Sequence, residues 1–232
     1  TALDLKALSA ASLSVTAGGA VTDSGTLAIT GATTLNSGSA DLTLDQSAST
    51  FGTLAITGAN VAVTENAATD LGSSTVSGTF GITSGGAITD SGTLAVTGDA
   101  TFTNTSGSND AITLDDASNA FAGTVTFATD SGSAVTIVDT TALDLKALSA
   151  ASLSVTAGGA VTDSGTLAIS GATTLNSGSA DITLDQSGST FGTLAITGAN
   201  VAVTENAAMD LGASTISGTA SFNSTSNAIT DS

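Results

Sequence analysis

The chain has 232 residues, 41% of them hydrophobic, and carries 20 carboxylates against two basic residues, for a formal net charge of −18. It lacks Cys, His, Pro, Trp and Tyr, which excludes thiolate and imidazole metal sites, cysteine nucleophiles, imidazole bases and disulfide bonds. The negative charge repels nucleic acids and anionic membrane surfaces, so neither is an expected partner. No apolar run approaches the length of a membrane helix, so we expect no membrane span.

Short alternating segments begin near the N-terminus and recur along the whole chain. In each of them two apolar residues flank one polar or small residue, which is the period-two pattern of a β-strand with one buried face. Helical spacing is not sustained anywhere, and Gly, Ser, Thr and Asn interrupt the chain every few residues. We therefore predict almost no helix. The first such pairs are Leu13 and Val15, Leu27 and Ile29, Leu42 and Leu44, Leu54 and Ile56, and Val61 and Val63.

The segments are organised in repeats. The Asp-Leu pair that begins at Asp4 returns at Asp70, Asp144 and Asp210, so the first and third steps are equal and the second is longer. The extra residues of the second unit lie around Ala122 and at 131–133, between apolar alternations, as expected if loops absorb added length. The predicted units are 1–66, 67–140, 141–206 and the partial unit 207–232.

A longer repeat contains the shorter one. Residues 1–79 return as residues 141–219 with 73 identities in 79 positions. We predict one continuous solenoid rather than separate domains, and, because the chain ends inside a repeat, a segment of a much longer repetitive protein. The six differing pairs are Thr30 and Ser170, Leu42 and Ile182, Ala48 and Gly188, Thr69 and Met209, Ser73 and Ala213, and Val76 and Ile216.

Strands this short cannot bury a face alone, and the turns between them lack the Asn-Gly and Asp-Gly pairs of hairpins. Stacking is the remaining solution, and the sequence predicts a right-handed parallel β-helix, a β-solenoid, of about ten coils of roughly 22 residues. Inward Val, Leu and Ile would form ladders, with the phenylalanines in wider corners. The phenylalanines are Phe51, Phe80, Phe102, Phe121, Phe127, Phe191 and Phe222.

Three phrases resemble the repeats of filamentous-haemagglutinin-type bacterial exoproteins, which are large repetitive surface or secreted adhesins. They are "GGAITDSGTLAVTGDATFT" at 85–103, "NDAITLDDASNAFAGTVTF" at 109–127 and "TDLGSSTVSG" at 69–78. The resemblance extends over nearly the whole chain. It implies a right-handed β-helical shaft, export from the cell, and a role in adhesion or in building surface filaments. The family's N-terminal secretion domain has no counterpart in these residues, and neither does a distinct binding domain.

Acidic residues are the candidates for a site, and each has a structural alternative. Asp23, Asp90 and Asp163 recur in a Thr-Asp-Ser-Gly motif, which suits either a calcium ladder or turns whose Asp accepts nearby backbone N–H groups. The chain lacks the Gly-Gly-x-Gly-x-Asp repeat of calcium β-rolls, which favours turns.

Paired carboxylates can act as acid and base in glycoside hydrolysis. The candidate pairs are Asp41 with Asp45 and Asp115 with Asp116. Without His, Arg, Tyr or Trp to assist or to stack on a sugar, a solvated acidic face is the favoured interpretation. We expect no enzyme and predict no catalytic, cofactor-binding or metal-binding residue, with calcium kept as a possible ligand.

Other polar features leave alternatives open. Outward Thr suits ice binding, but it is also what a strand facing water prefers. Asn104 and Asn223 begin Asn-x-Ser/Thr sequons. Lys6 and Lys146 occupy equivalent places and could pair with an acidic neighbour in the next coil.

The leading hypothesis is a structural shaft of an extracellular bacterial surface filament or adhesin, secreted or held at the cell surface. The alternative is a carbohydrate- or calcium-binding adhesive module, with ice binding ranked lower. Expected partners are other copies of the chain, assembled into a fibre, and glycans of host or neighbouring cells.

Overall fold

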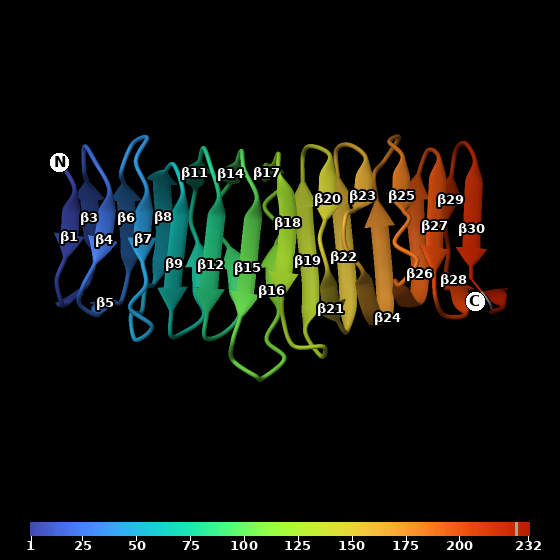
Figure 1. Cartoon of the computed structure of the whole chain (residues 1–232), viewed down its shortest axis with the longest axis horizontal. Helices are drawn as coiled ribbons and strands as arrows, with labels where there is room; N and C mark the ends of the chain where they lie inside the picture. Colours follow the sequence, from blue (N-terminus) through green and yellow to red (C-terminus); the bar gives the residue numbers. More distant parts are fainter. Residues whose placement is uncertain (226) are drawn as a thin grey trace.

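The computed structural model describes residues 1–225 and 227–232. The chain winds into a rod of stacked turns that carries its two ends at opposite tips (Figure 1). Over the described residues every named strand pairs in parallel with strands of neighbouring turns, and there is no helix. The protein is therefore an all-β solenoid of about eleven turns, as the alternating sequence predicts. Over the same residues, no helix is long and apolar enough to cross a membrane.

One uninterrupted sheet, called sheet 1, runs the length of the rod with one strand per turn. Its 12 strands are β1 (Leu3–Leu5), β4 (Val21–Asp23), β7 (Leu42–Leu44), β9 (Val61–Glu65), β12 (Phe80–Ser84), β15 (Ala100–Asn104), β18 (Thr124–Ala128), β20 (Leu143–Leu145), β23 (Val161–Asp163), β25 (Ile182–Leu184), β27 (Val201–Glu205) and β30 (Ala220–Ser224).

A second long column of strands, called sheet 2, forms the other flank. Its strands are β3 (Leu13–Thr16), β6 (Ala32–Asn36), β8 (Thr53–Gly58), β10 (Thr69–Leu71), β13 (Ile88–Asp90), β16 (Ile112–Leu114), β19 (Ala134–Asp139), β22 (Ser152–Ala157), β24 (Leu167–Asn176), β26 (Thr190–Gly198), β28 (Met209–Leu211) and β31 (Ile229–Asp231).

Two interrupted columns close the outline between the flanks. The first side contains β2 (Leu8–Ala10), β5 (Leu27–Ile29) and β21 (Leu148–Ala150), and the N-terminal parts of β24 and β26 extend it. The second side contains β11 (Ser74–Val76), β14 (Leu94–Val96), β17 (Ala120–Phe121) and β29 (Thr215–Ile216).

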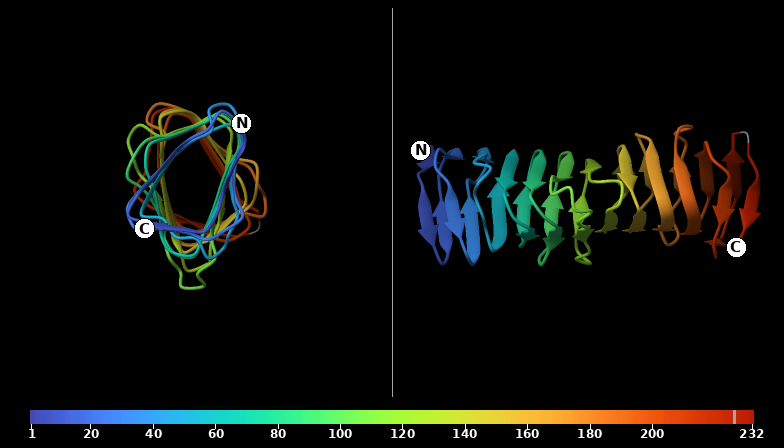
Figure 2. Two further views of the ribbon diagram at one scale, coloured as in Figure 1. Left: turned by 90° about the vertical axis from the view of Figure 1, so that its left-hand side faces the viewer. Right: turned by 90° about the horizontal axis from the view of Figure 1, so that it is seen from below.

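The winding is right-handed, as predicted. Sheet 1 faces the viewer in Figure 1, where its strands point downward. Seen from the N-terminal tip, this sheet lies on the right of a flattened closed outline (Figure 2). The chain therefore runs clockwise as it recedes from the viewer. Turn length is not constant along sheet 1, because the chain between the paired Leu3 and Val21 is shorter than the chain between the paired Ala100 and Val125.

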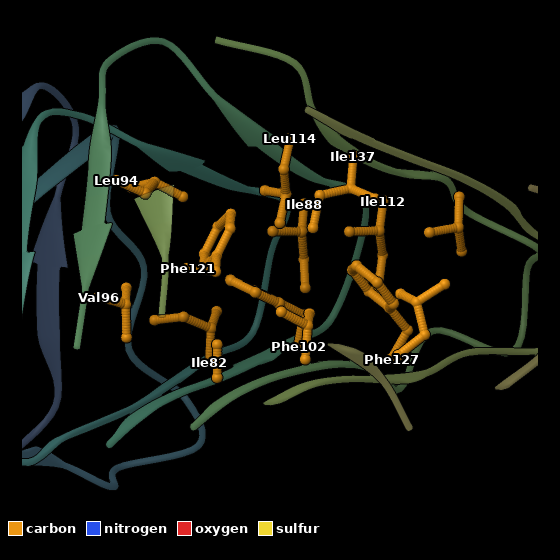
Figure 3. Packing of buried hydrophobic residues seen from close by; sticks show 14 of the residues in the cluster. Ile82, Ile88, Leu94, Val96, Phe102, Ile112, Leu114, Phe121, Phe127 and Ile137 are labelled. Atoms are coloured by element: carbon orange, nitrogen blue, oxygen red, sulfur yellow. The ribbon is translucent and has the colours of Figure 1, made fainter. Parts of the chain in front are cut away.

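The core is made of inward ladders in which each apolar residue lies on the one from the previous turn. In sheet 1, Val21 pairs with Leu42 and Leu42 with Val61, and all three are buried. In the neighbouring inward ladder of sheet 1, Ile82 pairs with Phe102, which stacks on Phe127 with ring centres 5.9 Å apart (Figure 3). Phe102 also meets Phe80 edge-on, with ring centres 5.8 Å apart. The expectation that phenylalanines fill corners is thus wrong for these three, which lie within strands of sheet 1.

The corners require glycine where one turn approaches the next. A Cβ on Gly52, which joins Phe51 to β8, would lie 2.6 Å from the carbonyl oxygen of Gly31 in the turn below. Real side chains do not tolerate this distance, so the tight spacing of the turns fixes glycine here.

The sequence units do not fill a whole number of turns. β4 of the first unit belongs to sheet 1, whereas the equivalent strands β13, β23 and β31 belong to sheets 2, 1 and 2. β20 is the counterpart of β1 in the second copy of the long repeat and is the eighth strand of sheet 1, so the long repeat covers seven turns. Each short unit therefore spans three and a half turns and moves its features to the opposite flank.

The chain passes from one column of strands to another within long strands. In β8, Thr53 and Leu54 pair with β10 of sheet 2, while Thr57 and Gly58 pair with β11, the start of the second side. The added residues of the second unit lie in the connections β17–β18 and β18–β19, outside the strands, as predicted. Near the same place the 105–111 connection between β15 and β16 projects from the rod (Figure 2).

Candidate functional site

The Thr-Asp-Ser-Gly aspartates join successive turns. Asp23 accepts the backbone N–H of Asp45 at 2.9 Å, and Asp163 accepts that of Asp185 at the same distance. Asp90 accepts the N–H of Asp115 at 2.8 Å. The carboxylates do accept backbone N–H groups, as expected of turn residues, but their donors lie in the next turn rather than nearby in sequence. Burial raises the pKa of Asp23 and Asp163, and the backbone hydrogen bonds offset this rise only in part.

One member of each candidate acid–base pair is engaged in similar contacts. Asp41 accepts the backbone N–H of Asn60 at 3.1 Å and its side-chain amide at 2.9 Å. Asp116 accepts the N–H of Ser118 at 2.9 Å and the hydroxyl of Thr93 at 3.2 Å. Over residues 1–225 and 227–232, no group of three or more acidic side chains is placed to hold a metal ion. Asp41 and Asp116 therefore serve as acceptors that link neighbouring turns.

A different set of acids lies inside the rod. Glu65 ends β9 with 2% of its surface exposed, and Glu205 ends β27 with 0% exposed. Asp139 ends β19 at the equivalent place of the second unit and is also buried. Glu65 and Glu205 are the only glutamates among the 20 acidic residues.

Each buried acid receives a phenylalanine N–H from the turn before it. Phe51 donates to Glu65 at 2.8 Å, Phe121 to Asp139 at 3.2 Å, and Phe191 to Glu205 at 3.5 Å. Burial raises the pKa of both glutamates from 4.5 to about 7, and it also raises the pKa of Asp139. The cause is the loss of water around a charge in an apolar core.

The two glutamates differ in one neighbour. The hydroxyl of Thr69 donates to the second carboxyl oxygen of Glu65 at 2.9 Å and also contacts the Ser84 hydroxyl at 3.0 Å. Met209 replaces Thr69 in the later copy, and Glu205 Oε2 is buried without a hydrogen-bond partner among the described residues. One of the six differences between the copies thus removes a donor from a buried acid.

The alternation of residues in the sequence predicts that these acids are buried, although their residue type does not. In "VAVTEN", Glu65 has the same parity as the inward Val61 and Val63, so period two alone places it inside. An acid is ordinarily assigned to the solvent, which is why these residues were not among the candidate sites.

Comparison with known families gives four consecutive matches. Residues 1–57, 58–128, 132–197 and 198–232 each match the model of a family described as repeats of unknown function (DUF5649). The chain belongs to this family. No curated protein and no solved structure matches it.

The three later family matches begin nine residues before the predicted units that start at 67, 141 and 207. The matches that begin at 58, 132 and 198 start just before β9, β19 and β27, the strands that end in the buried acids. These three matches therefore open with a buried carboxylate, and those at 58–128 and 132–197 continue for about three and a half turns. The three later starts lie beside strands of sheets 1, 2 and 1 in turn.

Two shallow grooves lie where the second side ends and the first side resumes. One has a volume of about 300 Å³ and is lined by residues that include Asp99, Thr124 and Asp144, where the second side ends. The other has a volume of about 390 Å³ and lies along Phe127 and Leu148, where the first side resumes at β21. Hydrogen bonds from Thr124 lower the pKa of Asp99, with a smaller effect of Lys146. Neither candidate acid–base pair lines these grooves.

The remaining candidates are distributed along the surface. Thr22 pairs with Thr43, but Ala62 and Gly81 follow in the same outward row, so the hydroxyls do not form a continuous array. Lys6 forms an ion pair with Asp4 of its own turn and donates to Ser24 of the next turn at 2.7 Å.

The two sequons differ in accessibility. Asn104 is buried, and its amide donates to the Asp110 carbonyl at 3.2 Å, so it is not available for glycosylation. Asn223 is exposed in β30.

Proposed function

We propose that this chain is the structural shaft of an extracellular surface filament or adhesin, and that its work is to provide length and stiffness. The observation that carries the proposal is the uninterrupted sheet 1, in which 12 strands from as many successive turns pair in parallel along the whole rod. A structure of this kind gains length by adding turns, because each turn contacts only its neighbours.

The surface supports this role. Outward positions are mostly Thr, Ser, Ala and Asp, and the net charge of −18 keeps neighbouring rods apart at low salt. The hydrogen bonds accepted by Asp23, Asp90 and Asp163 fasten consecutive turns without disulfides. A rod held in this way tolerates conditions outside the cell, and the resemblance to filamentous-haemagglutinin-type repeats supports the same location.

Adhesion itself is assigned to repetition of the surface or to other domains. The two grooves are shallow and carry no Tyr or Trp on which a sugar could stack. Glycans of host or neighbouring cells are the proposed contacts of the complete filament.

The location can be tested on intact cells of the source organism with antibody raised against residues 1–232. Gold label on filaments or on the surface of unpermeabilised cells is the expected result. Label that is seen only after permeabilisation would overturn the proposal. A glycan array with the purified chain then separates a shaft, which shows no binding, from an adhesive module.

A further inference from the structure

Glu65, Asp139 and Glu205 form a regular internal series. They are the most deeply buried acids among the described residues and lie in β9, β19 and β27, in sheets 1, 2 and 1, so an acid of this set recurs every three and a half turns. Each bridges two turns by accepting a phenylalanine N–H, and none touches solvent appreciably. The shaft does not need an acid at these positions to bury apolar surface, so the series calls for a separate explanation.

Among the residues that the structure describes, no positive charge compensates these acids. Glu65 is packed against the Phe51 segment, β10 and β12, which bring the polar groups Thr69 and Ser84. Asp70, beside Thr69 in β10, accepts the hydroxyls of Thr53 and Ser91 instead.

Glu205 is packed equivalently against the Phe191 segment, β28 and β30, with Met209 in place of Thr69. Asp210, next along β28, accepts the hydroxyl of Thr193 at 3.3 Å. Around Asp139 the donors are Phe121 and Thr141. Both lysines are exposed elsewhere, Lys6 on Asp4 and Lys146 beside Asp99.

We propose that these buried acids are proton-uptake positions that make the shaft more resistant to unfolding as the pH falls from about 8 to about 5. An ionised carboxylate inside an apolar core is unfavourable when no cation faces it, and a proton removes that cost. The glutamates dominate at mild pH, whereas Asp139 acts in the same direction.

The direction follows from linkage. The pKa of each glutamate rises from 4.5 in the unfolded chain to about 7 in the fold, because burial disfavours the charged form. Between these values the folded chain holds a proton that the unfolded chain has released. The added stability is therefore fully present below 4.5 and is lost as the pH rises through about 7.

Hydrogen exchange at single amides tests each glutamate separately. The amides of Phe51 and Phe191 report on Glu65 and Glu205, and their opening constants are corrected for the intrinsic exchange rate at each pH. We expect each constant to increase on the order of tenfold per pH unit between about 5 and about 7. A constant that is flat or that falls with pH overturns the proposal.

Variants identify the responsible group. Glu65→Gln and Glu205→Gln keep a side-chain oxygen for the phenylalanine N–H but cannot titrate, so each should remove the pH dependence at its own amide. Asp110→Asn, in the projecting 105–111 connection, is the matched control and should leave it unchanged. Persistence of the dependence in the glutamine variants overturns the proposal.

A second pair of variants uses residues that the repeat already contains. Met209→Thr supplies Glu205 with a hydrogen-bond donor, which favours the ionised carboxylate. The midpoint, meaning the pH at which the opening constant of the Phe191 amide stops rising, should therefore move downward. Thr69→Met removes the donor from Glu65, and should move the midpoint at Phe51 upward. Both substitutions place a residue found at the equivalent position of the other copy, so folding is retained. Midpoints that stay in place or move in the opposite directions overturn the proposal.

Discussion

Replacing Phe102 by alanine tests whether the core behaves as stacked layers. Phe102 is completely buried in β15 and contacts three other rings, Phe80, Phe121 and Phe127, at centre distances of 5.8, 6.0 and 5.9 Å. It is the only residue shared by these three contacts. The rings above and below cannot close the resulting space without breaking the register of sheet 1.

The expected cost is large and local. Truncating a buried phenylalanine to alanine costs about 3–5 kcal/mol of stability. Phe102→Ala should lie toward the upper end of this range, because it also removes three ring pairs worth about 0.5–1.5 kcal/mol each. Phe222→Ala removes the same atoms from β30, where the ring is only half-buried, and should cost about 1–2 kcal/mol. Since turns contact only their neighbours, the loss should be confined to the turns of β12, β15 and β18.

Urea unfolding combined with residue-resolved hydrogen exchange measures both quantities. The expected result is a loss of amide protection over β12, β15 and β18, with β1, β4, β27 and β30 unchanged. A cost below about 1 kcal/mol, or one equal to that of Phe222→Ala, would refute the layered core. Equal loss of protection in every turn would instead show that the rod unfolds as one cooperative unit.

Three further substitutions or treatments have defined outcomes. Ser189→Ala removes the hydroxyl that accepts the Leu167 N–H at 3.0 Å. It should lower the free energy of unfolding in urea by about 1–3 kcal/mol. The control Ser187→Ala changes an exposed side chain and should alter stability by less than about 0.5 kcal/mol. Gly52→Ala should cost about 1–3 kcal/mol because of the 2.6 Å approach to Gly31, while Gly188→Ala, which has its nearest neighbour at 3.4 Å and Ala48 as its counterpart, should be close to neutral. Addition of a chelator should leave the thermal midpoint unchanged, and a fall of several degrees would indicate a bound cation.

The strands and their inward faces were predictable from the sequence. Leu42 and Leu44 flank Thr43, and the structure buries the two leucines and leaves the threonine on the outer face of β7. This works because each turn presents the same environment, so local alternation is not overridden by distant contacts. The loops were predictable as well, since only connections can absorb the residues added near Ala122.

Two features could not be predicted from the local alternation of apolar and polar residues. The half-turn offset depends on where β8 bends from sheet 2 into the second side, and period two is identical on both flanks. The role of the acids was also hidden. The motif around Asp23 indicated a turn, but its donor belongs to the next coil, and only the stacking of coils shows which N–H group lies within reach.

The unit of three and a half turns has a consequence for proteins that gain or lose repeats. Adding one unit to the shaft reverses the azimuth of everything downstream, whereas adding two restores it, because the long repeat closes after seven turns. Any domain carried beyond the shaft would thus point to one side or the other according to whether the number of units is odd or even. Copy number then sets direction as well as reach.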